Sequence, residues 1–334
     1  MTGVVLEVKN LRKLFPVSRG IVGTLRRQPQ RCVHAVDGIS LSLSKGEILA
    51  LVGESGSGKT TTGLCTLGLV EPTEGRILLQ GEDVVEMARG ARRKGLRRKA
   101  QLIFQDPYES LNPRQTVFRA VGEPLDVHGL AANRSDKVSK VVQALDDAGL
   151  KPATSFLNRY PQELSGGQRQ RVVIASALVL NPAYLVADEP VSMLDVSIRA
   201  EILNLLLSLR DEHGISMVYI THDLASAAYV ADRVAVMYLG VIVEVGPADA
   251  VLSDPRHPYT RSLMSVIPVP NPRRRRKRMV LQGETPDPID LPSGCRFHPR
   301  CPEAISLCAK VEPQLEDLGD DHQVACLLVA RPPE

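Results

Sequence analysis

The sequence has no tryptophan, and aromatic residues make up only 4% of its 334 residues. It also has no uninterrupted apolar run of the roughly 18 residues that a membrane-spanning helix requires. The best stretch, residues 172–187, is broken by Asn181-Pro182. The N-terminus lacks a basic region followed by an apolar core, so no secretory signal is expected. These absences predict a soluble cytoplasmic chain that does not itself cross a membrane.

The chain also has little net charge, +3 from 41 basic and 38 acidic residues. Two stretches without acidic residues, 89–99 and 273–278, carry +7 and +6, and subtracting these 13 charges leaves −10 for the remainder. A uniformly basic surface for nucleic acid is therefore not expected. Each basic stretch is interpreted either as a solvated face or as a local patch for anionic lipid or a protein partner.

Cysteine is scarce, and its distribution is uneven. Four of the six cysteines lie in the last 40 residues: Cys295, Cys301, Cys308 and Cys326. In a reducing compartment this clustering favours a metal site over disulfides. The spacing C-x5-C-x6-C-x17-C is not that of paired C-x2-C zinc knuckles, and four thiolates suit either zinc or an iron–sulfur cluster. His298 and His322 are reserve ligands under the zinc alternative only.

The apolar pattern predicts an α/β fold. Continuous apolar runs at 48–52, 184–188 and 216–220 read as buried strands, and an amphipathic helix is predicted at 196–210 between the last two. This βαβ arrangement predicts a mainly parallel sheet. Further strands are expected at 4–8, 39–43, 76–80 and 101–104, helices at 59–70 and over most of 116–180, and a hairpin at 233–245.

The composition changes after Pro268. Prolines at 268, 270 and 272 precede six basic residues, which predicts a linker over 269–278. The expected organisation is therefore a main domain over 1–268, this linker, and a small cysteine-bearing extension over 279–334.

A glycine-rich loop follows the first buried strand. Residues 53–60, GESGSGKT, satisfy G-x-x-x-x-G-K-[ST] between a strand and a helix, the context that a phosphate-binding loop requires. Lys59 would neutralise phosphate charge and Thr60 would offer a hydroxyl to Mg²⁺. The residues expected to contact nucleotide in this loop are Gly53, Glu54, Ser55, Gly56, Ser57, Gly58, Lys59, Thr60 and Thr61.

Two carboxylates stand at the end of the predicted strand 184–188. Asp188 would reach the carboxyl edge of the sheet, where it can hold the water shell of the metal. Glu189 would orient and polarise an attacking water molecule, because phosphoryl transfer depends mainly on positioning and electrostatics. His222 follows the next strand.

A second anion-binding helix end is expected at Ser165, Gly166, Gly167 and Gln168, which open a predicted helix over 168–180. Adjacent glycines expose backbone N–H groups at a helix N-terminus, where the positive end of the helix dipole favours anions.

Taken together, these motifs resemble those of ATP-binding cassette (ABC) ATPases over residues 4–268. The resemblance implies a P-loop ABC nucleotide-binding domain with a parallel sheet core, an antiparallel β subdomain and a helical subdomain at about 106–180. It implies ATP and Mg²⁺ as cofactors, and a dimer in which residues 165–168 of one protomer contact the γ-phosphate of ATP held by the other.

The resemblance also implies individual roles. Gln105 is the Q-loop glutamine that senses Mg²⁺ and the attacking water, and His222 is the switch histidine. Asp195 is the D-loop aspartate, with Met193 where a small residue is usual. Phe15 is the aromatic residue expected on adenine.

Residues 104–113, FQDPYESLNP, are similar to the Q-loop region of ATPases that serve oligopeptide and dipeptide importers, as are 257–260 and the cysteine-bearing tail. The resemblance implies a transport ATPase at the cytoplasmic face of the membrane. Its implied partners are a second, distinct cassette, two permease subunits that dock near residues 106–112, and an extracytoplasmic solute-binding protein. It also favours [4Fe–4S] over zinc in the extension.

Three alternatives remain open. The solute could instead be nickel or glutathione, since specificity belongs to other subunits. A non-transport ABC protein acting on nucleic acid or ribosomes would typically carry two cassettes or a coiled-coil insertion, and this chain has neither. A cassette that binds ATP without turnover is disfavoured by the presence of Glu189 and His222.

Overall fold

The structure is a computed structural model that describes residues 3–17, 30–266 and 283–330. The predicted linker 269–278, with its basic stretch, lies outside the described residues. Within those residues, no helix combines the length and the apolar character that crossing a membrane requires.

The main sheet has eight strands in the order β11-β12-β10-β9-β3-β8-β7-β6. The five strands from β9 to β6 are parallel, and the other three are antiparallel. Both faces of this parallel part are covered, so every residue of β3 and β8 is buried. The strands are β3 Ile48–Val52, β6 Ala100–Ile103, β7 Tyr184–Asp188, β8 Ser216–Thr221, β9 Arg233–Tyr238, β10 Val241–Pro247, β11 Glu316–Asp317 and β12 Gln323–Val324.

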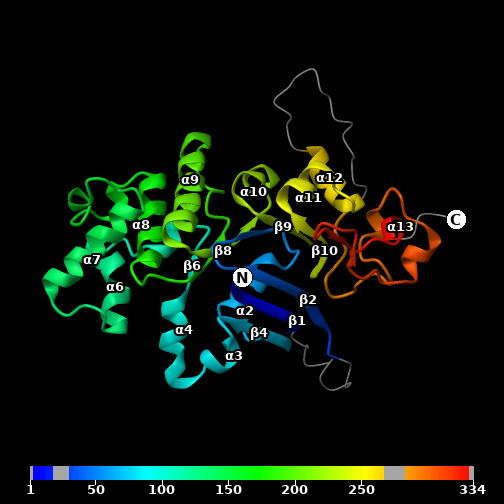
Figure 1. Ribbon diagram of the computed structural model, residues 1–334, viewed down its shortest axis with the longest axis horizontal. Helices are drawn as coiled ribbons and strands as arrows, with labels where there is room; N and C mark the ends of the chain where they lie inside the picture. Colours follow the sequence, from blue (N-terminus) through cyan, green and yellow to red (C-terminus); the bar gives the residue numbers. More distant parts are fainter. Residues whose placement is uncertain (1–2, 18–29, 267–282, 331–334) are drawn as a thin grey trace.

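A second, antiparallel sheet of four strands lies beside the main sheet in the order β2-β1-β4-β5 (Figure 1). Its strands are β1 Val4–Pro16, β2 Cys32–Ser44, β4 Glu74–Leu79 and β5 Glu82–Asp83. Leu49 and Leu51 of β3 pack into an apolar core shared with this sheet, whereas Ile48, Ala50 and Val52 pack into a second core with the helices. Successive side chains of β3 point to opposite faces of the sheet, so this strand contributes to both cores.

Helices α6, α7 and α8 gather at one end of the molecule, and residues 283–330 lie at the other end (Figure 1). The helices are α2 Lys59–Thr66, α3 Val84–Met87, α4 Arg93–Lys99, α5 Pro107–Ser110, α6 Val117–His128, α7 Arg134–Asp147, α8 Gly166–Leu178, α9 Val196–His213, α10 Leu224–Val230, α11 Ala248–Ser253, α12 Pro258–Val266 and α13 Leu327–Ala330. This arrangement confirms the predicted α/β class and its mainly parallel core.

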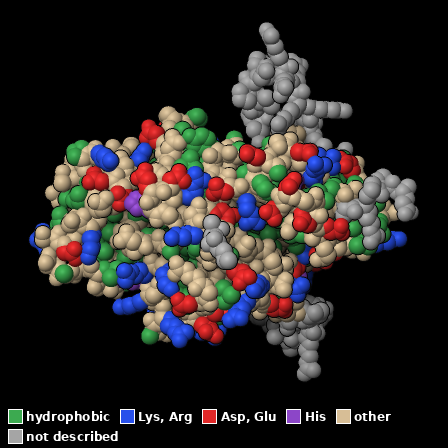
Figure 2. All heavy atoms as spheres, viewed as in Figure 1, with side chains coloured by type: hydrophobic (Ala, Val, Ile, Leu, Met, Phe, Trp, Pro, Cys, Tyr) green, Lys and Arg blue, Asp and Glu red, His purple; other side chains and the backbone are tan. Residues whose placement is uncertain are grey.

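The first basic stretch is more than a solvated face, because part of it forms α4. Leu96 of this helix is fully buried, and the Arg97 guanidinium donates to the backbone carbonyls of Leu67 and Gly68. Arg97 therefore binds the chain just beyond α2, which ends earlier than the predicted residue 70 because Gly68 turns into a left-handed conformation at φ 61°. On the face seen in Figure 2, acidic and basic side chains are interspersed.

The cysteine-bearing extension shares the core of the main domain. Its strand β12 pairs with β10, and Phe297 packs against Tyr238 and Tyr259 with ring centroids 5.3 and 5.4 Å apart. Residues 283–330 thus complete the sheet and the core of the main domain. The domain boundaries themselves stay predictions.

A buried ion pair ties the extension to β2. Arg296, 8% exposed, donates to the Asp37 carboxylate at 2.6 Å and to the Leu239 carbonyl. Replacing Arg296 with alanine is expected to lower the free energy of unfolding by about 2 to 3 kcal/mol, because the largely buried Asp37 carboxylate loses its 2.6 Å partner and keeps Arg12 at 2.9 Å and His34 at 3.2 Å. Urea unfolding at pH 7 measures this loss.

The loss should depend on pH. Burial raises the pKa of Asp37, but Arg296, His34 and Arg12 lower it by more, so the pKa lies below its ordinary value of 3.8. A lowered folded-state pKa contributes stability above the unfolded-state pKa, and that contribution disappears as the pH falls through the folded-state pKa. The difference between wild type and variant should therefore shrink below pH 3.8. Arg256→Ala, which removes an exposed pair with Asp254, is the control and should cost less than about 1 kcal/mol. An equal cost for both variants would contradict the prediction.

Candidate active site

The loop between β3 and α2 lies against the backbone of its neighbours. Gly58 has φ 102°, and a Cβ atom there would stand 2.1 Å from the Ala35 carbonyl oxygen. At Gly53 the corresponding atom would stand 2.3 Å from the Met237 carbonyl oxygen. Only glycine fits at these two points, which is why the loop can curl with its N–H groups inward.

Lys59 lies at the centre of this loop. Its ammonium donates to the carbonyls of Gly53 and Glu54, both at 2.8 Å, and the side chain is buried. Burial lowers the pKa of Lys59, and the nearby carboxylates of Glu189, Asp188 and Glu54 act in the opposite direction. The loop thus holds a positive charge where phosphates would bind.

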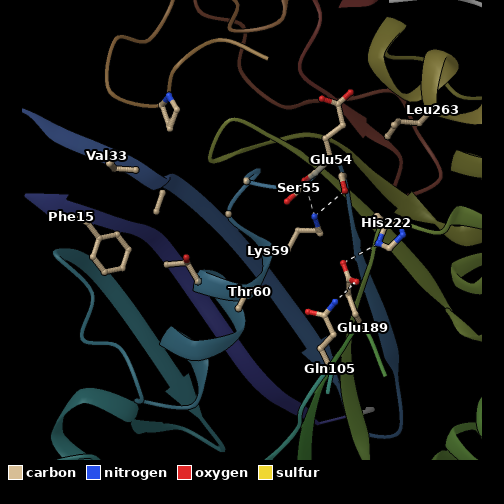
Figure 3. Close-up of a pocket in the computed structure, with 16 residues that line it drawn as sticks. Phe15, Val33, Glu54, Ser55, Lys59, Thr60, Gln105, Glu189, His222 and Leu263 are labelled. Atoms are coloured by element: carbon tan, nitrogen blue, oxygen red, sulfur yellow. Dashed lines mark hydrogen bonds and ion pairs between the residues drawn. The ribbon is translucent and has the colours of Figure 1, made fainter. Parts of the chain in front are cut away.

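The loop forms one side of an open cavity of about 870 Å³. Phe15 and Val33, from β1 and β2, stand at one end, and Glu189 and His222 stand at the other with Lys59 between them (Figure 3). One end of the cavity is therefore apolar and the other polar. The lining residues are Phe15, Val33, Ala35, Gly53, Glu54, Ser55, Gly56, Gly58, Lys59, Thr60, Thr61, Gln105, Glu189, His222, Leu263 and Pro288.

Glu189 is held by two neighbours at the carboxyl edge of the sheet. Its Oε1 lies 2.9 Å from Nδ1 of His222, and its Oε2 accepts from Nε2 of Gln105 at 3.0 Å (Figure 3). The three residues follow the adjacent parallel strands β6, β7 and β8, so the topology brings them together. Glu189 also has φ 46°, a left-handed conformation that is uncommon for a residue with a side chain and is often found at functional sites.

Asp188 and Thr60 form a second polar pair beside Lys59. Burial has the largest effect on Asp188 and raises the pKa of its carboxyl above the ordinary value of 3.8, while the neighbouring Thr60 hydroxyl acts in the opposite direction. A hydroxyl and a carboxylate are oxygen ligands of the kind that Mg²⁺ accepts, with phosphates and water completing its shell. The pair fits the predicted magnesium site. Gln105, also predicted there, directs its amide to Glu189.

The predicted signature and D-loop residues do not line this cavity. At the start of α8, Ser165 and Gln168 form a capping box, and Ser165 is exposed. Gly167 has a packing role that the sequence did not reveal, because a Cβ atom there would meet Ile198 at 2.5 Å. Asp195 is exposed at the start of α9.

The lining residues Val33, Ala35, Leu263 and Pro288 were not predicted, and neither were two residues that bind Glu54. The Tyr259 hydroxyl accepts the backbone N–H of Glu54 at 2.9 Å, and Arg300 forms an ion pair with the Glu54 carboxylate at 2.9 Å. The similarity of residues 257–260 to peptide-importer ATPases is the only sequence signal for Tyr259. Nothing in the sequence pointed to Arg300.

The four clustered cysteines face a common interior. Cys308 and Cys326 are buried, and Cys295 and Cys301 are partly buried. Burial, followed by the charges of the other three thiols, raises the pKa of Cys295 to about 11. Within the described residues no group of three or more His, Cys, Asp or Glu side chains is arranged to hold a metal ion, so the iron–sulfur and zinc alternatives gain no support here. His298 and His322 contact the Cys295 carbonyl and Glu244 instead.

Comparisons with known proteins agree with this geometry. Residues 36–192 match the family model described as "ABC transporter", and residues 243–308 match "Oligopeptide/dipeptide transporter, C-terminal region". The chain is similar to "Oligopeptide transport ATP-binding protein AppF" of Bacillus subtilis (strain 168), 44% identical over 97% of each chain. It is 47% identical to "Putative peptide import ATP-binding protein BOV_A0347" of Brucella ovis, over 87% of this chain and 91% of that protein.

Solved structures show the same fold. The ATP-binding cassette MJ0796, described as a dimer in a post-hydrolysis state bound to ADP and Pi, is 28% identical with a TM-score of 0.62, over 73% of this chain and 98% of that one. The cbiO1 protein of Clostridium perfringens is also 28% identical, with a TM-score of 0.63, over 75% of this chain and 91% of that one. This chain therefore belongs to the ABC transporter family, among the ATP-binding proteins that carry the oligopeptide/dipeptide transporter C-terminal region.

Proposed function

We propose that this chain hydrolyses ATP to energise the import of oligopeptides or dipeptides, as one subunit of an ABC transporter at the cytoplasmic face of the membrane. The observation that carries the proposal is Glu189, held between Gln105 and His222 beside Lys59, in a chain whose residues 243–308 match peptide transporters. The names of its relatives, which include oligopeptide transport and peptide import proteins, support the choice of solute.

The geometry supports the following chemical roles. Lys59 and the loop N–H groups bind the phosphates, and Thr60 with Asp188 would hold Mg²⁺, which supplies neutralising charge to the phosphate oxygens. Glu189 orients a water molecule that attacks the γ-phosphorus as the bond to the β-phosphate oxygen breaks. ADP, inorganic phosphate and the proton of the water are the products. His222 fixes the Glu189 carboxylate at the polar end of the cavity, where the γ-phosphate would lie.

Two cassettes are needed for the complete site. Each chain carries one phosphate loop and one signature, and residues 165–168 do not line the cavity of their own chain. The exposed Ser165 and Asp195 lie where a second cassette can meet them, beside Met193 and Val196, which are 62% and 81% exposed. A related but distinct second cassette subunit completes the pair. In this proposal the cassette comprises residues 1–268 and includes a helical subdomain at about 106–180 and an antiparallel β subdomain.

Residues 106–112, with Phe104 beside them just before Gln105, are the proposed contact with two permease subunits. Phe104 and Tyr108 are 52% and 64% exposed, large apolar side chains of the kind that mark an interaction surface. An extracytoplasmic solute-binding protein delivers the peptide to these subunits. Residues 106–112 thereby link the Gln105–Glu189 contact to the membrane.

The four cysteines of the extension are proposed to hold a [4Fe–4S] cluster. The proposal rests on the clustering of Cys295, Cys301, Cys308 and Cys326 in the last 40 residues and on the match of residues 243–308 to the C-terminal region of oligopeptide/dipeptide transporters. Within the described residues no group of three or more metal-ligating side chains is arranged for a metal ion, which favours neither the cluster nor zinc, so the metal content of the purified protein decides between them. Anaerobically purified protein is expected to contain about four iron atoms per chain and to absorb visible light. Iron-free, colourless protein would contradict this.

ATPase assays on the reconstituted transporter test the proposed function. With its solute-binding protein present, peptides are expected to stimulate ATP hydrolysis and to accumulate inside proteoliposomes. Nickel and glutathione, delivered in the same assay, are the matched controls. Stimulation by either of these and not by any peptide would overturn the choice of solute, and an absence of ATP hydrolysis would overturn the proposed function itself.

A further inference from the structure

The cysteine-bearing extension reaches the phosphate loop through Arg300. Both Nη atoms of the Arg300 guanidinium donate hydrogen bonds to the Glu54 carboxylate, at 2.9 Å to Oε2 and 3.3 Å to Oε1. Thr285 of the same extension donates its hydroxyl to Glu54 Oε2 at 2.7 Å. Glu54 is the second residue of the phosphate loop and points away from Lys59 in Figure 3. Two side chains of the extension thus fix one carboxylate of the loop.

This contact is shielded and well supported. The Arg300 side chain is only 9% exposed and that of Glu54 is 28% exposed. Arg300 ends a short 3-10 turn, residues 298–300, directly after Phe297, whose ring packs on Tyr238 and Tyr259. The aromatic cluster therefore sets where the guanidinium stands. A planar bidentate pair at such a shielded position is stronger than an ordinary surface ion pair.

The extension also forms a wall of the cavity itself. Pro288 lines the cavity, and its carbonyl accepts the backbone N–H of His34 at 2.9 Å, next to Val33 of the apolar end. The segment from Thr285 to Pro288 thus runs from the phosphate loop to β2. Nucleotide in the cavity would lie against residues on both sides of the linker.

The charge of Glu54 explains why the contact matters. A carboxylate that lines a phosphate-binding cavity repels a triphosphate, and its charge reaches Lys59 in this structure. Arginine is always protonated in proteins, so a bidentate arginine both neutralises this carboxylate and fixes its direction. Without Arg300, Glu54 would remain an uncompensated negative charge beside the phosphates.

We propose that Arg300 is a positioning residue of the ATP site, which neutralises Glu54 and holds it away from the phosphates, so that the extension completes the nucleotide site of its own cassette. The inference rests on the proposed ATPase function and adds a role in it for the extension. It makes the phosphate loop dependent on residues that lie about 246 positions further along the chain.

Nucleotide titrations of the full-length chain test this role. Arg300→Ala is expected to weaken ATP binding by about 10-fold, the usual effect of losing a charged hydrogen-bonded partner. ADP, with less negative charge, should lose less affinity than ATP. In the assembled transporter the KM for ATP should rise while kcat at saturating ATP stays near that of wild type, because Glu189, Gln105 and His222 are untouched.

The decisive variant is the double substitution Arg300→Ala with Glu54→Gln. It removes the uncompensated carboxylate and is expected to restore ATP affinity to within about 2-fold of wild type. The matched control is Arg261→Ala, which removes another bidentate pair, Arg261–Glu303 at 2.9 and 3.0 Å, between α12 and the extension without touching the loop. Thermal unfolding shows whether the Arg300→Ala protein is folded. If it is not, Arg300→Gln is compared with Arg261→Ala in its place.

Two results would overturn the inference. One is a loss of ATP affinity in Arg300→Ala that is no larger than in Arg261→Ala. The other is failure of the double substitution to recover affinity in a folded protein, which would make Arg300 a purely structural residue. If wild-type protein itself fails to bind ATP, the proposed function fails, and this outcome is distinct from both.

Discussion

Replacing Glu189 with glutamine is expected to reduce the ATPase rate of the assembled transporter by about a thousandfold, within the range for a lost general base. The substitution keeps the size of the side chain but removes the negative charge that polarises the attacking water. Glutamine can still bond to Gln105 and His222, which contact the carboxylate at 3.0 and 2.9 Å. ATP binding should persist, because Lys59 and the phosphate loop are unchanged.

Steady-state phosphate release and bound-nucleotide content measure the two effects separately. The variant should retain ATP, not ADP, after rapid removal of free nucleotide. Glu212→Gln, at an exposed position near the end of α9, is the matched control and should turn over like wild type. Hydrolysis by Glu189→Gln at more than a tenth of the wild-type rate would show that another group activates the water.

Replacing Lys59 with alanine is expected to weaken ATP binding by about 100-fold or more, because a buried charge-assisted contact to phosphate is lost. Lys59 is 6% exposed and donates to the Gly53 and Glu54 carbonyls at 2.8 Å. The variant therefore loses the charge at the centre of the loop and leaves two carbonyls without their donor. Turnover should fall in parallel at ordinary ATP concentrations.

Fluorescent-nucleotide titration measures this loss, and thermal unfolding without nucleotide shows whether the fold persists. Lys151→Ala, which removes an exposed lysine far from the loop in sequence, is the control. Near-normal ATP affinity in a folded Lys59→Ala protein would contradict the assignment of the phosphate-binding loop.

Much of the candidate site at the carboxyl edge of the main sheet could be predicted, because it depends on local sequence patterns. The apolar runs at β3 and β7 were predicted with their observed bounds, and the loop motif fixed Lys59 and Thr60. The resemblance to ABC ATPases was the only basis for expecting the side chains of Gln105, Glu189 and His222 to lie close together. Each of them follows a different strand, and apolar patterning does not give the order of strands in a sheet.

The contacts of the extension could not be predicted for a physical reason. Strands β11 and β12 have two residues each, too few for an alternating pattern. The pairs Arg296–Asp37 and Arg300–Glu54 join residues about 259 and 246 positions apart. Such pairs arise only once the sheet and the aromatic cluster place the two segments together. An ordinary arginine in a loop gives no sign of them in the sequence.

The most direct test of the account is a cryo-EM map of the transporter with Glu189→Gln and bound ATP. The account predicts that each ATP is bound by both cassettes. The γ-phosphate of ATP on the phosphate loop of the second cassette should contact the backbone N–H groups near Ser165 and Gly167, at the start of α8 of this chain. ATP on the Lys59 loop of this chain should contact the corresponding helix of the second cassette. A map in which ATP occupies the loop while that helix end points away from every triphosphate would contradict it.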